Sequence, residues 1–317
     1  MSFDQLMDHA RQIEELATRW AVVMSKEGLG DQAPPAVDQV RPDSPTYGAD
    51  YQRFQAQFAF VPTLFEPFAS CPDPALFTPL IHDVDDVLKR LSFGAGAVDP
   101  FTGYSYGANS DLEKMTGASS ALEGWTGRAA MNFKETFIDP FRSIEGNQFL
   151  LAQALKCTLE AEQAIWVATR RDIDDIAHKT LAALDHMQDC GRNTWGQTFT
   201  VAACLTSLVA APFSGGLSLA LDLVGAAAWV AAASPPSSAP TIEFSGETPQ
   251  AVLASMSDAV GRLGQDIRSQ RDRIDRCLAA ARLELSQNGR QYTFPRPELA
   301  GSPPSTLTGP FGLGYVQ

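Results

Sequence analysis

Apolar residues recur at alternating spacings of three and four along much of this chain, and this period constrains the fold more than any other feature. Such spacing places side chains on one stripe of an α-helix, whereas a half-buried strand alternates every second residue. No convincing run with the strand period is found. The first helical stripe comprises Phe3, Leu6, Ala10, Ile13, Ala17, Trp20 and Met24. The sequence therefore predicts an all-α protein.

Stretches rich in proline, glycine or aspartate separate the further apolar stripes. One helix is expected to begin at Asp73-Pro74, because aspartate caps a helix and proline is tolerated in its first turn. The stripe of this helix comprises Phe77, Leu80, Val84, Val87 and Leu91. A long helical pattern covers 133–184, with Pro140 as an expected kink or restart. Another covers 253–281 with heptad spacing, which indicates an elongated antiparallel bundle or hairpin.

The breaks between these patterns divide the chain into five expected segments. An N-terminal amphipathic helix and linker (1–48) precede a helical-hairpin bundle (49–192). An apolar Ala/Gly-rich segment (193–240) follows, and then a heptad helix that packs on the bundle (241–287). The last segment (288–317) is rich in proline and glycine and has few apolar residues, so we expect a disordered C-terminal tail.

The charge of the chain limits its partners. Lys and Arg total 24 against 37 Asp and Glu, which gives a net charge of −13. Such an acidic surface repels phosphate backbones. The most basic stretch contains Arg268, Arg271, Arg273 and Arg276, but aspartates are interleaved with these arginines, which is typical of a solvated helix face. We therefore expect no nucleic-acid partner.

Sequence patterns for catalysis are lacking. The chain has no phosphate-binding loop that ends in Gly-Lys-Ser/Thr, no Gly-x-Ser-x-Gly and no His-Glu-x-x-His. The nearest approach to a metal cluster is His178, His186 and Cys190, with Asp185 and Asp189 nearby, but polar residues are common at the end of a long helix. The five cysteines are widely spaced and form no Cys-x-x-Cys pair. We expect a non-enzymatic protein without cofactor or metal.

The residues Trp125-Thr126-Gly127 lie between two amphipathic helical patterns. Gly127 permits a tight reversal of the chain that other residues would strain. The ring of Trp125 would be buried against both helix ends, and Phe133 would begin the apolar stripe of the second helix. The pattern predicts a helical hairpin with its turn at these residues.

The segment Leu122-Glu123-Gly124-Trp125-Thr126-Gly127-Arg128-Ala129-Ala130-Met131-Asn132-Phe133 resembles the Trp-x-Gly family of type VII secretion substrates of actinobacteria and firmicutes. The core of the resemblance covers roughly 109–190. The apolar segment, the heptad helix and Phe294-Pro295-Arg296-Pro297 follow in an order similar to that of larger actinobacterial members. The resemblance implies assembly with like or related hairpins, and the type VII secretion machinery as a partner.

The export signal of that family is usually a tyrosine with Asp or Glu four residues later. No tyrosine of this chain is followed in that way, and the nearest analogue is Phe294 with Glu298. The N-terminus lacks the basic-then-apolar pattern of a secretory signal peptide. We expect a secreted or cell-envelope-associated protein that is cytoplasmic before export, with the signal in this chain or in a partner.

Segments 201–211 and 217–233 are almost wholly apolar, but each is shorter than the about 20 residues that cross a membrane as a helix. Asp222 would be costly against lipid unless it lined a pore or was paired. Small residues recur at every fourth position, which allows close helix contact: Ala203, Ser207, Ala211 and Gly215. Two interpretations stay open, a buried Ala/Gly-rich hairpin and a membrane-inserting hairpin.

These patterns support two hypotheses for function. The first is a type VII secretion substrate or substrate partner that acts by helical protein–protein association. Its heptad helix would pack on the hairpin or recruit a copy or partner. The contact residues of that helix would be Leu253, Met256, Val260, Leu263 and Ile267. The alternative is a membrane-inserting or pore-forming effector that uses 201–233.

Overall fold

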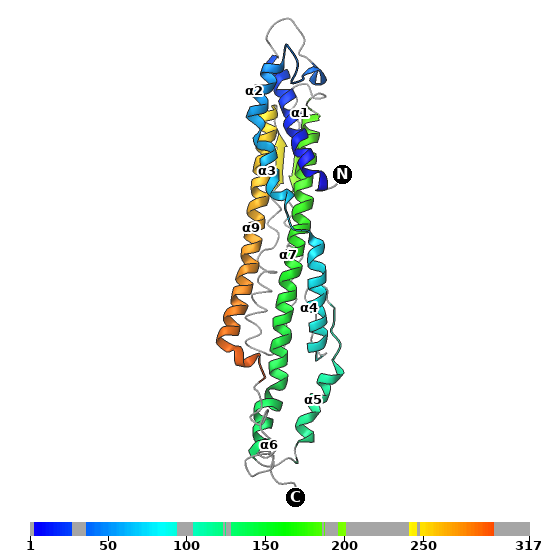
Figure 1. Ribbon diagram of the computed structural model, residues 1–317, viewed down its shortest axis with the longest axis vertical. Coiled ribbons are helices and arrows are strands. Elements are labelled where there is room, and N and C mark those ends of the chain that lie inside the picture. The colour runs from blue at the N-terminus through cyan, green and yellow to red at the C-terminus, as the bar shows by residue number, and fades with distance from the viewer. Residues whose placement is uncertain are drawn as a thin grey trace. The chain divides into compact units, whose positions relative to one another are not determined.

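The computed structural model describes residues 3–26, 36–93, 104–122, 124, 128–185, 187, 196–200, 241–245 and 248–294. Most of these residues are helical, which confirms the helical class predicted from the sequence (Figure 1). The α-helices are α1 (Leu6–Lys26), α2 (Gly48–Phe58), α3 (Phe60–Ala69), α4 (Phe77–Leu91), α5 (Ser110–Ala121), α6 (Arg128–Phe133), α7 (Asp139–Asp185) and α9 (Pro249–Asn288). Short 3₁₀ turns occur at Phe3–Gln5, Val37–Gln39, Pro74–Leu76 and Gly289–Gln291. The apolar segment 201–233 and residues 295–317 of the predicted disordered tail lie outside the described residues. Residues 288–294 of that tail are described and ordered, with the 3₁₀ turn Gly289–Gln291 and a buried Tyr292, so the prediction of disorder from residue 288 was wrong for them.

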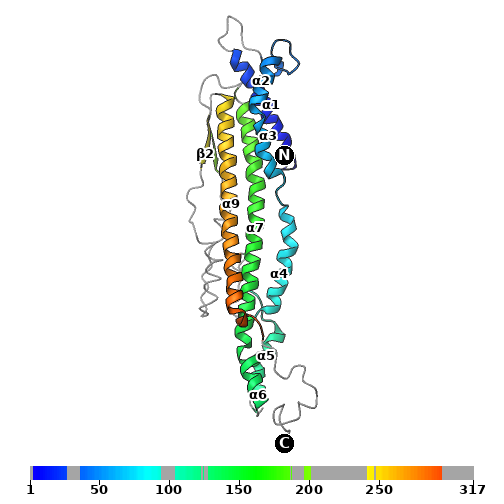
Figure 2. The same cartoon turned by 60° about the vertical axis from the view of Figure 1, so that its left-hand side comes forward.

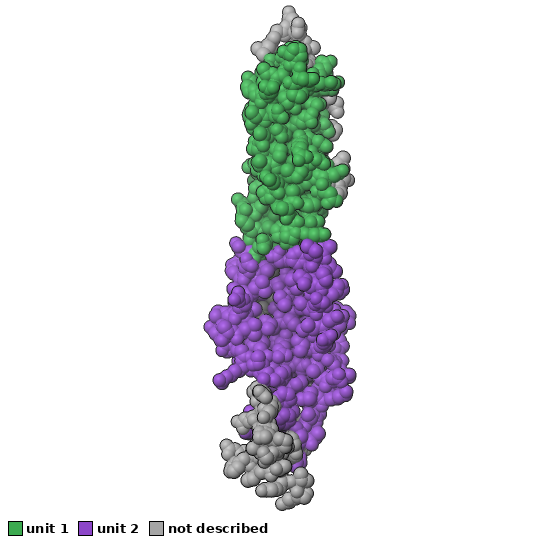
Figure 3. Space-filling model, in the orientation of Figure 1, with its two compact units in different colours: residues 1–74, 163–206, 234–271 green, residues 75–162, 207–233, 272–317 purple. Residues whose placement is uncertain are grey.

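The chain divides into two compact units, each built from segments that are far apart in the sequence (Figure 3). Unit 1 contains 1–74, 163–206 and 234–271. Unit 2 contains 75–162, 207–233 and 272–317. Helices α7 and α9 therefore contribute to both units. The division of the chain into five segments remains a prediction from the sequence.

The core of unit 1 is built around α1. The predicted stripe of this helix is buried at its centre, since Leu6, Ala10, Ile13, Ala17 and Trp20 are all at most 7% exposed. Helix α1 contacts α2 and α3. Its buried side chains share one apolar core with residues of α3, α7 and α9. The local helical period thus placed the core-facing side of α1 correctly, because a surface helix buries one stripe.

Within unit 1, α7 and α9 lie side by side and run in opposite directions (Figures 1 and 2). The guanidinium of Arg271 lies 5.5 Å from the ring centre of Trp166. Asp266, earlier in α9, is within electrostatic range of Asp172, which is later in α7. Residues later in α7 therefore lie beside residues earlier in α9, as expected for two antiparallel helices.

One cluster of buried residues in unit 2 consists of Leu88, Tyr106 and Phe149, which pack together. Here α7 meets the chain after α9, where the Asn147 and Gln148 side-chain amides donate hydrogen bonds to the carbonyls of Gln291 and Tyr292 at 3.0 and 2.7 Å. Near the start of α7, rings stack in a group that comprises Phe133, Phe137, Phe141 and Phe294.

Pro140 is the second residue of α7, directly after a π-helical turn at Lys134–Ile138. Proline lacks the N–H that continues an α-helical ladder, and a π-helical turn is one way to accommodate that loss. The restart expected at Pro140 is therefore present as a change in helical type.

Two short strands, β1 (Gly196–Thr200) and β2 (Thr241–Ser245), pair in antiparallel fashion from Gly196↔Ser245 to Thr200↔Thr241. The sequence pattern did not predict them. Each strand has five residues, so the alternation of apolar and polar side chains covers only about two cycles. Threonine and phenylalanine, which favour extended backbone, are the local signal that these segments carry.

Candidate functional site

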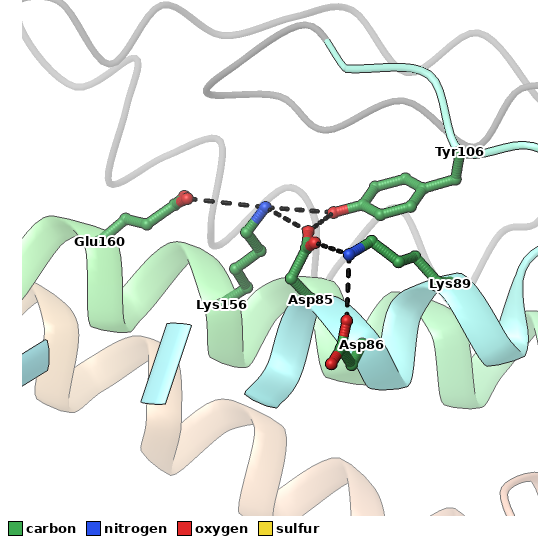
Figure 4. A network of polar contacts seen from close by, with 6 residues as sticks. All are labelled: Asp85, Asp86, Lys89, Tyr106, Lys156 and Glu160. Carbon is green, nitrogen blue, oxygen red and sulfur yellow. Dashed lines mark hydrogen bonds and ion pairs between the residues drawn. The ribbon is translucent and has the colours of Figure 1, made fainter. Parts of the chain in front are cut away.

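Helix α4 is held to α7 by a network of polar side chains in unit 2 (Figure 4). The carboxylate Oδ1 of Asp85 accepts hydrogen bonds from the Tyr106 hydroxyl at 2.7 Å and from the Lys156 ammonium at 3.0 Å. The other carboxylate oxygen, Oδ2, lies 2.8 Å from Lys89 Nζ. Lys156 Nζ also donates to the Tyr106 hydroxyl at 3.1 Å and lies 3.7 Å from Glu160. Asp85 is therefore the centre at which α4, α7 and the 104–109 segment meet.

The electrostatics of the network keep Asp85 ionised. Burial acts to raise the pKa of Asp85, but the hydrogen bonds from Lys89, Tyr106 and Lys156 together outweigh it and hold that pKa well below its usual range. The bonds to Asp85 and Asp86 raise the pKa of Lys89 above its usual range. A carboxylate that accepts three hydrogen bonds is a weak base, so this arrangement is suited to anchoring a helix rather than to proton abstraction.

Asn109 connects the end of α4 to the start of α5. Its backbone N–H donates to the Ser92 carbonyl at 2.8 Å, and its side-chain amide donates to the Arg90 carbonyl at 2.7 Å. Its side-chain oxygen accepts a hydrogen bond from the Asp111 N–H at 3.0 Å. One asparagine thus satisfies carbonyls at the C-terminal end of α4 and caps α5. Tyr106, three residues earlier, is thereby kept beside Asp85.

The network fixes the rotation of α4 and so decides which of its apolar side chains reach solvent. Leu88 is fully buried, whereas Leu76, Leu80 and Val87 are 66%, 49% and 44% exposed. Leu76 is the last residue of the 3₁₀ turn directly before α4 and has helical backbone angles. The three residues are spaced by four and seven, so they lie on one stripe along this turn and α4. Large apolar side chains that gather on a surface are typical of interaction sites. We call Leu76, Leu80 and Val87 the α4 stripe, and it is the candidate functional site of this chain.

The sequence pattern assigned the faces of α4 only in part. It placed Leu80 and Val87 on the same apolar face as Phe77, Val84 and Leu91. The structure leaves Leu80 and Val87 exposed, keeps Phe77, Val84 and Leu91 half-buried and buries Leu88 instead. The physical reason is that Asp85, three residues before Leu88, is turned toward α7 by its bonds to Lys156 and Tyr106.

The predicted hairpin turn is only partly within the described chain. Trp125 and Gly127 lie outside the described residues, and so do Ala203, Ser207, Ala211, Gly215 and Asp222. Helix α5 ends at Ala121 and α6 begins at Arg128, on the two sides of the expected turn. Phe133 is half-buried and stacks on Phe137 with 5.2 Å between ring centres. The hairpin remains a prediction.

The predicted contact residues of the heptad helix lie in α9 within unit 1. Leu253, Met256, Val260 and Leu263 are buried in the core, and Ile267 packs against it. These side chains therefore pack inside this chain. A sequence stripe alone does not tell an internal contact from one with a partner.

One cluster that the sequence analysis did not assemble is in unit 1. His9 of α1 lies beside Asp174 and His178 of α7, and one ligand atom from each of the three side chains lies within 4.8 Å of the other two. Asp174 and His178 are four residues apart, so they lie on one face of a helix, and this spacing was the signal in the sequence that could have indicated the pair. Of the earlier metal-like set, Asp185 lines a pocket with His178, whereas His186, Asp189 and Cys190 lie outside the described residues.

Comparison with models of protein families, with curated proteins and with solved structures found no match to this chain. Among the described helices, none combines the length and the apolar character that a membrane crossing requires. Function is therefore argued from the sites themselves.

Proposed function

We propose that this protein acts without catalysis, by binding a helical partner protein through the α4 stripe, as a substrate or substrate partner in type VII secretion. The observation that carries the association is the exposure of Leu80 and Val87 on α4, whose rotation is fixed by the Asp85 network, and of Leu76 directly before this helix. A rigid binding surface loses less conformational entropy when it associates, so more of its interaction energy becomes affinity.

The spacing of the α4 stripe favours a helix as the bound element. Residues spaced by four and seven form a seam along a helix, and the complementary surface is the apolar seam of a second helix. Burying one such side chain completely gains about 1.5–3 kcal/mol, and these three are already partly covered. A gain of about 1 kcal/mol from each supports a reversible interaction that needs further contacts around it.

The net charge of the chain favours a partner with basic residues beside its apolar seam. Asp83 and Asp86 are exposed on α4, where Lys89 pairs with Asp86 at 3.0 Å, and the whole chain carries a net charge of −13. An acidic surface selects basic partners and repels other acidic surfaces, including its own copies. We therefore propose a different protein, rather than a second copy, as the occupant of the α4 stripe.

The assignment to type VII secretion rests on the resemblance around Trp125 and Phe133. The break between α5 and α6 at that position supports it, and so does the opposite direction of α7 and α9 in unit 1. We propose that these helices belong to the elongated antiparallel bundle expected from the sequence. Culture supernatants of strains with and without the secretion ATPase test the assignment. The protein is expected only in supernatants of strains that have the ATPase, and equal amounts in both would overturn it.

Site-specific photo-crosslinking in the producing cell tests the association. A crosslinking residue at position 80 is expected to capture one defined protein, and Leu76→Glu in the same chain is expected to abolish that capture. The control position is 283, because Leu283 of α9 is also exposed, at 57%. Mass spectrometry of the adduct distinguishes a different protein from a second copy. Equal capture from positions 80 and 283, or capture of a second copy, would contradict the proposal.

A further inference from the structure

Three side chains of residue types that bind metals in other proteins converge in unit 1, which does not contain the α4 stripe. His9 of α1 is 3% exposed, and its Nδ1 lies 3.8 Å from Asp174 Oδ1 of α7. The ring of His178, one helical turn after Asp174, lies 4.6 Å from the ring of His9 between their centres. Its Nδ1 lies 3.5 Å from Asp174 Oδ2. Two helices thus supply an N, N, O donor set.

Two buried atoms of this cluster, Nδ1 of His9 and Oδ1 of Asp174, have no hydrogen-bond partner among the residues that the structure describes. They face each other at 3.8 Å, which is beyond the 2.7–3.2 Å of an N–H···O bond. Buried polar atoms are nearly always satisfied, so this pair calls for a third group. Two ligands of one tetrahedral zinc ion are about 3.4 Å apart, as bonds of about 2.1 Å require. A metal ion between these atoms would satisfy both after a shift of a few tenths of an ångström.

The tautomer of His178 suits metal binding. Its Nδ1 lies 2.8 Å from the backbone carbonyl of Asp174. A carbonyl only accepts hydrogen bonds, so Nδ1 carries the proton and the lone pair of the neutral ring is on Nε2. Ligating histidines commonly donate their other ring N–H to a backbone carbonyl in this way, which fixes the ring.

The buried position of His9 disfavours the charged form of its ring. Burial first, and then the neighbouring His178, lower the pKa of His9, although Asp174 and Asp8 oppose this shift. The lone pair of a neutral imidazole is available for coordination at neutral pH.

A pocket of about 580 Å³ has one member of the cluster, His178, in its lining. Glu15, Arg19 and Asp185 also line it, and Arg19 pairs with Glu15. Asp185 adds a further carboxylate, and negative charge beside a site raises the local concentration of cations. Water from this pocket can complete the coordination, which three protein ligands leave open.

We propose that His9, Asp174 and His178 form a three-ligand site for a divalent transition-metal ion, best matched by Zn²⁺, that joins α1 to α7. Two histidines and one carboxylate are a donor set that zinc accepts in proteins with water in the remaining position. The hard ion Mg²⁺ prefers oxygen ligands and is excluded by the two imidazoles.

Calorimetry and thermal unfolding of the full-length protein, first freed of metal by a chelator, test the proposal. Zn²⁺ is expected to bind with one equivalent per chain and to raise the unfolding temperature by about 5 °C when saturating, because a ligand of the folded state stabilises it. Mg²⁺ at the same concentration is expected to leave that temperature unchanged. With Co²⁺ in place of Zn²⁺, visible absorption bands would report nitrogen and oxygen ligands.

The variants Asp174→Asn and His178→Gln separate metal binding from folding. Both keep the size of the side chain, and the His178 side chain is 30% exposed, so we expect both to fold without metal. Each is expected to weaken Zn²⁺ binding by at least about tenfold. The control is His82→Gln, which alters an exposed histidine of α4 and is expected to bind Zn²⁺ as the wild type does. Unaltered binding by Asp174→Asn and His178→Gln, or no binding by the wild type, would overturn the site.

Discussion

Asp85 of α4 and Lys156 of α7 form an ion pair, with 3.0 Å between Oδ1 and Nζ, although 71 residues separate them in the chain. Their side chains are only 19% and 6% exposed. Solvent therefore screens the pair less than it screens an ion pair on the surface. This contact, with Tyr106 on the same carboxylate oxygen, explains why α4 turns Leu88 inward and leaves Leu80 outside.

Replacing Asp85 with Asn is expected to lower the free energy of unfolding by about 3 kcal/mol, because the buried Lys156 loses its principal carboxylate. Denaturant unfolding followed by circular dichroism measures the change. Lys156→Met and the double variant complete a mutant cycle, for which we expect a coupling of at least about 1 kcal/mol. Asp86→Asn is the control, since Asp86 is exposed, with an expected change within about 0.5 kcal/mol. Equal effects at positions 85 and 86 would argue against the anchoring role.

The contribution of Asp85 is expected to depend on pH in the acid range. Its pKa is lower in the folded protein than the ordinary 3.8, so the unfolded chain takes up the proton more readily. The stabilisation is therefore complete above about pH 4 and is lost as the pH falls toward the folded-state pKa. The stability difference between wild type and Asp85→Asn should narrow when unfolding is measured from pH 5 down to pH 2. A difference that stays constant would contradict this assignment.

The contribution of Glu145 to the free energy of unfolding is expected to depend on pH in the opposite direction to that of Asp85. Burial raises the pKa of Glu145 from 4.5 to about 7, and within the described part of the chain no group hydrogen-bonds to its Oε2. The folded protein binds the proton more tightly here, so stability falls as the pH rises from about 4.5 to about 7. Glu145→Gln removes the charge and should be more stable than the wild type by about 1–3 kcal/mol at pH 8. The two proteins should converge below about pH 4.5, and a pH-independent difference would exclude burial of this carboxylate as the cause.

The two faces of α4 should respond differently to truncation. Leu88→Ala is expected to cost about 2–5 kcal/mol of unfolding free energy, because Leu88 is fully buried and its loss leaves a cavity. Leu80→Ala is expected to cost less than about 1 kcal/mol, because half of that side chain is already in solvent. Thermal unfolding of both variants measures the contrast. A larger loss for Leu80→Ala would mean that α4 is rotated from the orientation described here.

The sequence predicted the helices better than it predicted their contacts. It found the buried stripe of α1 from Leu6 to Trp20, because a helical period repeats within one element. It also identified the heptad stripe of α9. It did not show whether this stripe contacts a partner or the chain itself, and in the structure Leu253 and Met256 face the core of unit 1. Strands β1 and β2 were not predicted, because five residues contain too few repeats of the alternation that marks a strand.

The sequence by itself determined where the helices form, because spacing, caps and prolines act within a few residues. Only the tertiary structure decided that His9 meets Asp174 and His178, that Asp85 meets Lys156, and that Leu80 stays outside. Each of those outcomes depends on which helices pack together and how each is rotated about its axis. Interactions between distant parts of the chain set those variables, so no local pattern of residues encodes them.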